Sequence, residues 1–147
     1  MYKHILVPTD GSKLSDKAVR EATGLAKTCG AKLTLFYCAP GYPTPMYAEG
    51  ALIAYLPPAK FKKDAEAHAT RVLEAAKKRA GAAGVPVATT FVTSDAPWQA
   101  IIRAATKAKC DLVVMASHGR RGLSGVLLGS ETHKVLTHSH LPVLVVR

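Results

Sequence analysis

The chain has 147 residues, of which 48% are hydrophobic and 20% are charged. This length and balance predict one folded domain over residues 1–147 and exclude a disordered chain, because disordered chains are poor in apolar residues. The formal net charge is +10, which favours anionic partners without choosing between nucleic acid, membrane surfaces and phosphate ligands.

Membrane insertion and disulfide bonding are not expected from the sequence. No apolar run approaches the roughly 20 residues that a membrane-spanning helix needs. The opening residues MYKHILVPTDGS lack the layout of a signal peptide, so we expect a cytoplasmic location and no membrane partner. Cys29, Cys38 and Cys110 lie far apart in the chain and predict buried free thiols rather than disulfides or a zinc site.

The first half of the chain alternates between strand and helix patterns. An apolar run predicts a strand over Lys3–Thr9, and Ser12 then caps a helix whose apolar residues recur every three or four positions until Gly30. A second strand is predicted over Ala31–Cys38. The stretch Ala39–Pro58 is rich in Pro, Gly and Tyr and is long for a connection, so it is either a binding loop or a poorly ordered crossover.

The second half continues the alternation. The predicted elements are a helix over Ala59–Ala83, a strand over Val85–Val92, a helix over Ala96–Ala108 capped by Asp95, a strand over Asp111–Ser117, a Gly-rich loop over His118–Gly129, a helix over Ser130–His138 and a strand over Leu141–Arg147. Thr89 and Thr90 make the third strand more polar than the others, which favours an edge position.

Five strands alternating with four helices predict an α/β protein with a parallel sheet and helices on both faces. Unbroken runs of Val, Ile and Leu in the strands are typical of sheets buried on both sides. In such a sheet, ligands bind beyond the carboxyl ends of the strands, at the point where the strand order reverses. The ends of the first and fourth strands therefore become the candidate site.

The loop after the fourth strand predicts a phosphate site. It leads into the helix that starts at Ser130, and a helix N-terminus presents unpaired N–H groups to anions. Gly129 lets the backbone approach a ligand closely, while Ser130 and Thr132 add hydroxyl groups. Arg120 and Arg121 add positive charge. Glycines between a strand and a helix also serve turns alone, so that alternative stays open.

Three segments resemble the universal stress protein family: ILVPTDGS near the start, VVMASHGRRGLSGVLLGSET in the last third, and LPVLVV at the end. The resemblance runs nearly end to end and implies a Rossmann-like sheet with strand order 3-2-1-4-5. The ATP-binding members of this family carry the pattern Gly-x2-Gly-x9-Gly-Ser/Thr. The matching positions are Ala116, Gly119, Gly129 and Ser130, so the spacing is kept while alanine replaces the first glycine.

This resemblance implies that the chain binds ATP or ADP, together with Mg²⁺ or Mn²⁺, between the end of the first strand and the Gly-rich loop. The residues that it places at the nucleotide are Pro8, Thr9, Asp10, Cys38, Met115, Ala116, Gly119, Gly129, Ser130, Glu131 and Thr132. The methyl group of Ala116 is expected to be tolerated in a strand, although it could crowd the ribose. Glu131 is expected to contribute only its backbone N–H, because its carboxylate repels phosphate unless a metal intervenes.

Several of these residues have simpler alternatives. Asp10 fits a turn or a helix cap as well as a ribose contact. Cys38 fits a core thiol as well as a backbone contact to adenine, and Ser130 fits a helix cap. The late histidines His133 and His138 lack the i,i+4 spacing of a helical metal pair, and we expect surface positions for them.

The function that these features favour is an ATP-binding regulatory or stress-protective module, in which the nucleotide orders the loop Gly119–Leu128 or the Tyr-rich segment. One alternative is slow ATP hydrolysis or nucleotidyl transfer. Because the sequence holds no P-loop lysine, GxSxG or HExxH motif, we expect weak hydrolysis at most. Nucleic-acid binding is less favoured, because the lysines are spread over helices and the aromatic residues form no stacking platform.

The last strand predicts a partner. If the strand order of the family holds, Leu141–Arg147 lies at the outside of the sheet. An apolar outer strand with free N–H and C=O groups aggregates unless it is paired or covered. Pairing with its own copy across a two-fold axis would satisfy the free N–H and C=O groups of this strand. We therefore predict a homodimer through Pro142–Val146.

Overall fold

The computed structural model describes residues 1–43, 57–119 and 128–147. Its strands are β1 (His4–Pro8), β2 (Lys32–Ala39), β3 (Val87–Thr93), β4 (Leu112–Ala116) and β5 (Val143–Val146). Its helices are α1 (Lys13–Cys29), α2 (Pro58–Gly81), α3 (Pro97–Lys107) and α4 (Ser130–His138). Each predicted element is present, with ends that differ by a few residues at most. The central parts of both predicted loops, including Arg120 and Arg121, lie outside the described residues.

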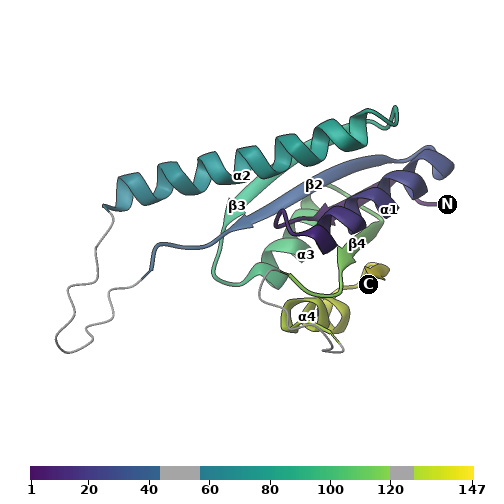
Figure 1. Cartoon of the computed structure of the whole chain (residues 1–147). Helices are drawn as coiled ribbons and strands as arrows, with labels where there is room; N and C mark the ends of the chain where they lie inside the picture. The colour runs from purple at the N-terminus through teal and green to yellow at the C-terminus, as the bar shows by residue number, and fades with distance from the viewer. Residues whose placement is uncertain (44–56, 120–127) are drawn as a thin grey trace.

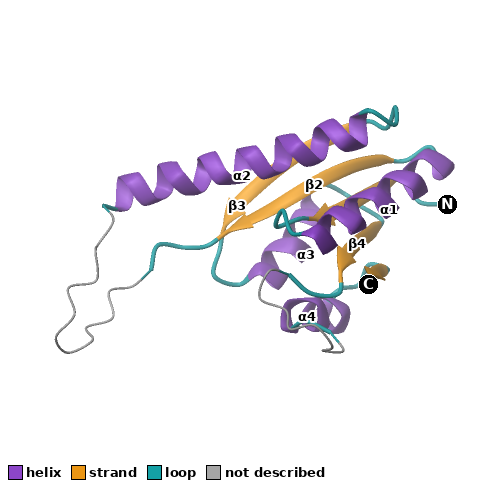
Figure 2. Cartoon of the chain, in the orientation of Figure 1, coloured by secondary structure: helices purple, strands orange, loops and turns teal. Residues whose placement is uncertain are grey.

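The strands form one parallel sheet in the order β3-β2-β1-β4-β5. Figure 2 shows the neighbouring strands β3 and β2 of this sheet, with helices around it. This arrangement confirms the predicted α/β fold and its strand order. β1 lies at the centre, paired with β2 on one side and with β4 on the other. The order of the strands along the chain therefore reverses beside β1, and the crevice expected in such sheets lies at its carboxyl end.

Helices cover both faces of the sheet: α1 and α2 pack on one face, and α3 and α4 lie on the other (Figure 1). Successive strand residues alternate between the two cores. Ile5 and Val7 belong to the cluster under α1 and α2, whereas Leu6 belongs to the cluster under α3 and α4. In β4, Met115 belongs to the second cluster and Ala116 to the first. The two-residue period of a strand accounts for this division.

The ends of α1 confirm two sequence predictions. The Ser12 side chain accepts a hydrogen bond from the N–H of Ser15 at 3.2 Å, as a helix N-cap does. Gly30 has φ +65° and donates its N–H to the carbonyl of Ala26. This left-handed conformation suits glycine, so Gly30 ends the helix as expected.

The predicted cap of α3 is wrong. The N-cap position is Ala96, not Asp95, and no side chain of this residue caps the helix. Asp95 instead accepts a hydrogen bond from the N–H of Gly41 at 3.0 Å. A Cβ atom at Gly41 would lie 2.6 Å from the same carboxylate. Asp95 is therefore committed to the segment that follows β2, which sequence proximity to α3 did not reveal.

The outer strands leave apolar side chains at the surface. β3 is an edge strand, as its threonines predicted, and Phe91 and Val92 are exposed. β5 forms the opposite edge, and Leu144 is 44% exposed there. None of the helices in the described ranges combines the length and hydropathy that crossing a bilayer requires.

The three cysteines are free thiols, as predicted. The expectation that they are buried holds for Cys110 only, because Cys29 and Cys38 are half-buried. Burial raises the pKa of the Cys110 thiol to about 11, so this thiol stays protonated and inert at neutral pH.

His4 is a buried polar residue at the amino end of β1. Its Nε2 atom lies 2.8 Å from the hydroxyl of Thr34 on β2. Its backbone N–H donates to the carboxylate of Asp111 at 3.0 Å. Burial, reinforced by the positive charge of Lys32, lowers the pKa of the His4 imidazole below the usual 6.5. The folded state therefore prefers neutral His4.

We expect this histidine to weaken the fold in mild acid. With a lowered pKa in the folded state, stability is full above pH 6.5 and falls as the pH drops below that value. Urea unfolding at about pH 8 and about pH 5 measures the loss. A His4→Leu/Thr34→Val variant, which removes both polar partners, should lose less stability between these conditions than the native chain. Exposed His133→Gln is the control, and an identical loss in all three proteins would contradict the assignment.

Candidate functional site

A cavity of about 760 Å³ opens at the carboxyl ends of the central strands. The eleven residues predicted for the nucleotide all line it: Pro8, Thr9, Asp10, Cys38, Met115, Ala116, Gly119, Gly129, Ser130, Glu131 and Thr132. They come from four separate stretches of chain, which the parallel sheet brings to one edge. The structure thus gathers the predicted residues at a single place.

Eight further residues line the same cavity. They are Ser15, Phe36, Pro40, Ser94, Asp95, Pro97, Ile101 and His118. The sequence analysis placed His118 in the Gly-rich loop, where a ligand contact was an alternative to a plain loop role, and assigned none of the other seven to the predicted site. Ser94 and Asp95 follow β3 directly, so the rule that parallel strands end at one edge could have found them. Ile101 carried no such signal, because its position follows from the packing of α3 on the sheet. Phe36 lies beside Pro8 in the register of β1 and β2, which the sequence alone does not fix.

Hydroxyl groups organise the end of β1. The hydroxyl oxygens of Thr9 and Ser15 lie 3.1 Å apart, and Ser15 donates to the carbonyl of Ser12 at 3.0 Å. Both Thr9 and Ser15 are buried. The carboxylate of Asp10 accepts the N–H of Ser12 at 2.9 Å, which supports the turn alternative raised for this residue. This network holds the β1–α1 loop against the cavity.

Two glycines allow the loops after β1 and β4 to meet. A Cβ atom at Gly119 would lie 2.8 Å from the carboxylate of Asp10. A Cβ atom at Gly129 would lie 3.1 Å from Cα of His118 and 3.2 Å from the carbonyl oxygen of Ser117. Gly129 also donates its N–H to that carbonyl at 2.7 Å. The absence of a side chain therefore serves close approach of protein segments at both positions.

The first turn of α4 forms one end of the cavity. The N–H of Gly129 is occupied, so the amides that remain for an anion are those at the start of the helix proper, from Ser130 onward. Ser130 is exposed, and no side chain caps this helix. Thr132 is buried and donates its hydroxyl to the carbonyl of Ala116 at 3.0 Å. Thr132 therefore fastens α4 to β4, and its proton is not available for phosphate.

Glu131 has a structural partner that sequence reasoning missed. Its carboxylate accepts the backbone N–H of Trp98, in the first turn of α3, at 2.9 Å. Its other oxygen lies 3.1 Å from the ammonium group of Lys134. Glu131 thus provides the cap that Asp95 was expected to provide. The two residues lie 33 positions apart in sequence, so no local pattern indicates this contact.

The departure from the glycine pattern at Ala116 is accommodated by the strand. Ala116 belongs to the apolar cluster under α1 and α2, and it is 8% exposed. Its neighbour Met115 belongs to the cluster on the opposite face. The added methyl group therefore packs in the core, in keeping with the tolerance expected for a strand position, while Ala116 also lines the cavity.

Cys38 lies on the wall formed by the end of β2. Its thiol lies 3.5 Å from the carbonyl oxygen of Ser94, which accepts from it. Burial raises the pKa of the Cys38 thiol above its usual value, and the carbonyl contact opposes this only in part. The thiol is therefore neutral at physiological pH, which argues against a nucleophilic role.

The described lining is acidic although the whole chain is basic. It contains the carboxylates of Asp10, Asp95 and Glu131 and no lysine or arginine. Each carboxylate accepts a backbone N–H, from Ser12, Gly41 and Trp98 respectively. Among the described residues, no group of three or more His, Cys, Asp and Glu side chains is placed to hold a metal ion. These carboxylates thus hold backbone segments around the cavity in place.

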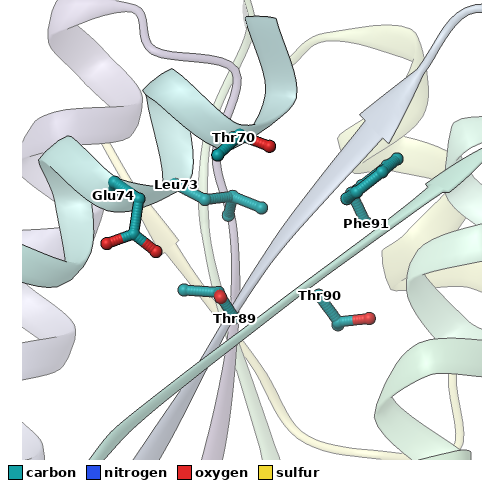
Figure 3. Close-up of a pocket in the computed structure, with 6 residues that line it drawn as sticks. All are labelled: Thr70, Leu73, Glu74, Thr89, Thr90 and Phe91. Atoms are coloured by element: carbon teal, nitrogen blue, oxygen red, sulfur yellow. The ribbon is translucent and has the colours of Figure 1, made fainter. Parts of the chain in front are cut away.

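A second, smaller hollow of about 330 Å³ lies between α2 and β3, away from this crevice. Figure 3 shows its residues, which are Thr70, Leu73 and Glu74 from the helix and Thr89, Thr90 and Phe91 from the strand. It shares no residue with the larger cavity. None of the predicted site residues lies there.

The sequence model of the universal stress protein family matches residues 1–147. The chain belongs to the universal stress protein family. Universal stress protein MJ0531 of Methanocaldococcus jannaschii is 35% identical over 150 residues, which cover 100% of this chain and 83% of that protein. Universal stress protein YxiE of Bacillus subtilis is 32% identical and is matched over its whole length.

Solved structures share the fold of this universal stress protein. The structure of protein MJ0577 superimposes with a TM-score of 0.82 at 26% identity, over 99% of this chain and 96% of that one. A universal stress protein in complex with cAMP superimposes with a TM-score of 0.72 at 30% identity, over 99% and 97% of the two chains. Both likenesses extend over the strands and helices that build the cavity.

Replacing Gly129 should loosen the cavity. In Gly129→Ala the new methyl group meets backbone atoms of Ser117 and His118, and such overpacking costs about 1–3 kcal/mol of unfolding free energy. Gly24→Ala is the matched control, because nothing lies within 4 Å of its added methyl group and the helix gains about 0.5–1 kcal/mol. Urea unfolding measures both. Equal behaviour of the two variants would show that Gly129 is not sterically required.

Proposed function

We propose that this universal stress protein binds an adenine nucleotide, ATP or ADP with Mg²⁺ or Mn²⁺, and acts as a cytoplasmic regulatory or stress-protective module. The observation that carries the proposal is the convergence of all eleven predicted residues on one cavity of about 760 Å³. That volume lies within the range of small-molecule sites, which is about 300–1,000 Å³. The crevice lies where the strand order reverses, the usual ligand position in this class of fold.

Charge gives the proposed ligand an orientation. The first turn of α4 offers backbone N–H groups to the phosphates, and the positive end of the helix dipole favours them. The carboxylates in the described lining oppose a free polyphosphate. A divalent cation on the phosphates offsets this repulsion, which is why we propose the metal complex of the nucleotide. The net charge of +10 attracts such anions at long range.

A related protein supports the class of ligand. The universal stress protein solved in complex with cAMP is 30% identical to this chain and shares its fold over nearly the whole length. An adenine nucleotide is thus bound by a structure of this kind. We extend that ligand class to the present chain because the cavity, its glycines and the α4 N-terminus are all in place.

Calorimetric titration with ATP and Mg²⁺ tests the proposal. The native chain should bind, and Ser130→Asp should bind at least about tenfold more weakly, because a carboxylate at the phosphate end costs more than about 1.4 kcal/mol. Folding should survive this change, since an acidic residue in the first turn stabilises a helix. Ala59→Asp makes the matched change in the first turn of α2 and should leave binding intact.

Two results would count against nucleotide binding. One is the absence of heat from the native chain at millimolar ATP with Mg²⁺, joined to the absence of nucleotide in the purified protein. The other is an equal affinity of the native chain and Ser130→Asp, which would place any bound ATP away from α4.

We also propose that the protein forms a homodimer through Pro142–Val146. β5 lies at the edge of the sheet, is uncharged, and carries Leu144 with 44% of its surface exposed. Val143 and Val145 are half-buried on the side of α3 and α4. An unprotected apolar edge of this kind is stabilised by pairing with a second copy.

Sedimentation equilibrium at micromolar concentration tests the dimer. Leu144→Glu should shift the population to monomer, because the two-fold axis brings like charges together and the apolar contact is lost. Val92→Glu on β3 is the matched control, since Val92 is 40% exposed on the strand at the opposite edge of the sheet. A native chain that sediments as a monomer, or a control that dissociates equally, would refute pairing at β5.

A further inference from the structure

Two helices that border the cavity begin without a capping side chain of their own. The N-cap of α3 is Ala96 and that of α4 is Gly129, and neither forms a side-chain cap. The unpaired N–H groups of a first helical turn need partners. For α3, the carboxylate of Glu131 supplies one by accepting the N–H of Trp98 at 2.9 Å. A single side chain thus joins the first turns of both helices.

The first turn of α3 is itself part of the cavity. Pro97 and Ile101 line it from this helix. The Trp98 ring lies against His138 of α4, with ring centroids 4.7 Å apart and an angle of 32° between the planes. The placement of this wall therefore depends on the contacts between α3 and α4, and Glu131, which lines the cavity, provides a polar contact between them.

We propose that Glu131 is a positioning residue of the nucleotide cavity, which fixes the first turn of α3 through Trp98 and conveys to it the charge of a bound phosphate. Only the second part of this inference, the effect of a bound phosphate, rests on the proposed function. The backbone of Glu131 belongs to the turn offered to the phosphates, while its carboxylate holds the other helix. A phosphate placed there repels that carboxylate and weakens its hold on the N–H of Trp98.

Lys134 does not remove this effect. Its ammonium group lies 3.1 Å from the carboxylate of Glu131, but both side chains are substantially exposed, at 46% and 36%. Lys134 contacts one carboxylate oxygen, and the other oxygen accepts from the N–H of Trp98. The ion pair therefore leaves the bond to Trp98 in place, and a phosphate on the cavity side acts on that bond.

The first half of the proposal is tested without nucleotide. Trp98 is the only tryptophan of the chain, so intrinsic fluorescence reports on this turn alone. Glu131→Gln keeps an oxygen that accepts from the N–H of Trp98, and its emission maximum should match the native one. Glu131→Ala removes the acceptor, and its maximum should shift to longer wavelength. Glu66→Ala, which removes a carboxylate 4.0 Å from Lys62 on α2, is the control and should cause no shift.

The second half is tested by titration with ATP and Mg²⁺. Glu131→Gln should bind about fivefold more tightly than the native chain, because a like charge leaves the phosphate end while the cap stays. Glu131→Ala should not show this tighter binding, because the first turn of α3 is no longer held by a side chain of α4. The shift in Trp98 emission on ATP addition should be smaller in Glu131→Gln than in the native chain. A purely structural role would leave the native and Gln affinities equal.

The outcomes separate this inference from the proposed function. If the native chain and both Glu131 variants bind ATP with equal affinity and equal change in emission, the effect of a bound phosphate on Glu131 is overturned while nucleotide binding stands. If none of them binds ATP, the proposed function fails, and the nucleotide-free emission of Glu131→Ala still decides whether Glu131 holds α3. Native-like emission in Glu131→Ala would overturn that link.

Discussion

The hydrogen bond from the N–H of Gly129 to the carbonyl of Ser117, 2.7 Å long, holds the start of α4 against the end of β4. No residue with a side chain fits there without displacing backbone atoms of Ser117 and His118. The buried hydroxyl of Thr132 adds a second bond between the same two elements. Together these contacts bring the amides of a helix N-terminus to the end of the central strands, and the cavity exists because of that approach.

Local sequence patterns predicted the elements well because their signals are local. Ser12 and Gly30 act on neighbours four residues away or fewer, and both perform the predicted role. Asp95 failed because its carboxylate found the N–H of Gly41, which lies 54 positions earlier. Glu131 took over the cap of α3 from another helix. Local rules thus predict which residue types can cap a helix, whereas tertiary contacts decide which side chain forms the cap.

The candidate site shows the same division. The glycine spacing and the family resemblance predicted residues from four stretches of the chain, and all of them line the cavity. Ile101 was missed because the packing of α3 against the sheet brings it there, and Phe36 was missed because it depends on the register that places it beside Pro8. The tolerance expected at Ala116 agrees with the alternation of β4, since that residue belongs to the core under α1 and α2.

At the far end of the sheet, the carboxylate of Asp111 accepts the N–H groups of Lys3 and His4 at 2.8 and 3.0 Å. β1 is thus anchored where it begins, and its other end is held by the bond from the N–H of Thr9 to the carbonyl of Phe36. β1 is therefore held at both ends and paired with a strand on each side, which restricts its movement. Ligands of different size must therefore be accommodated by the loops around the cavity, while the end of β1 stays in place.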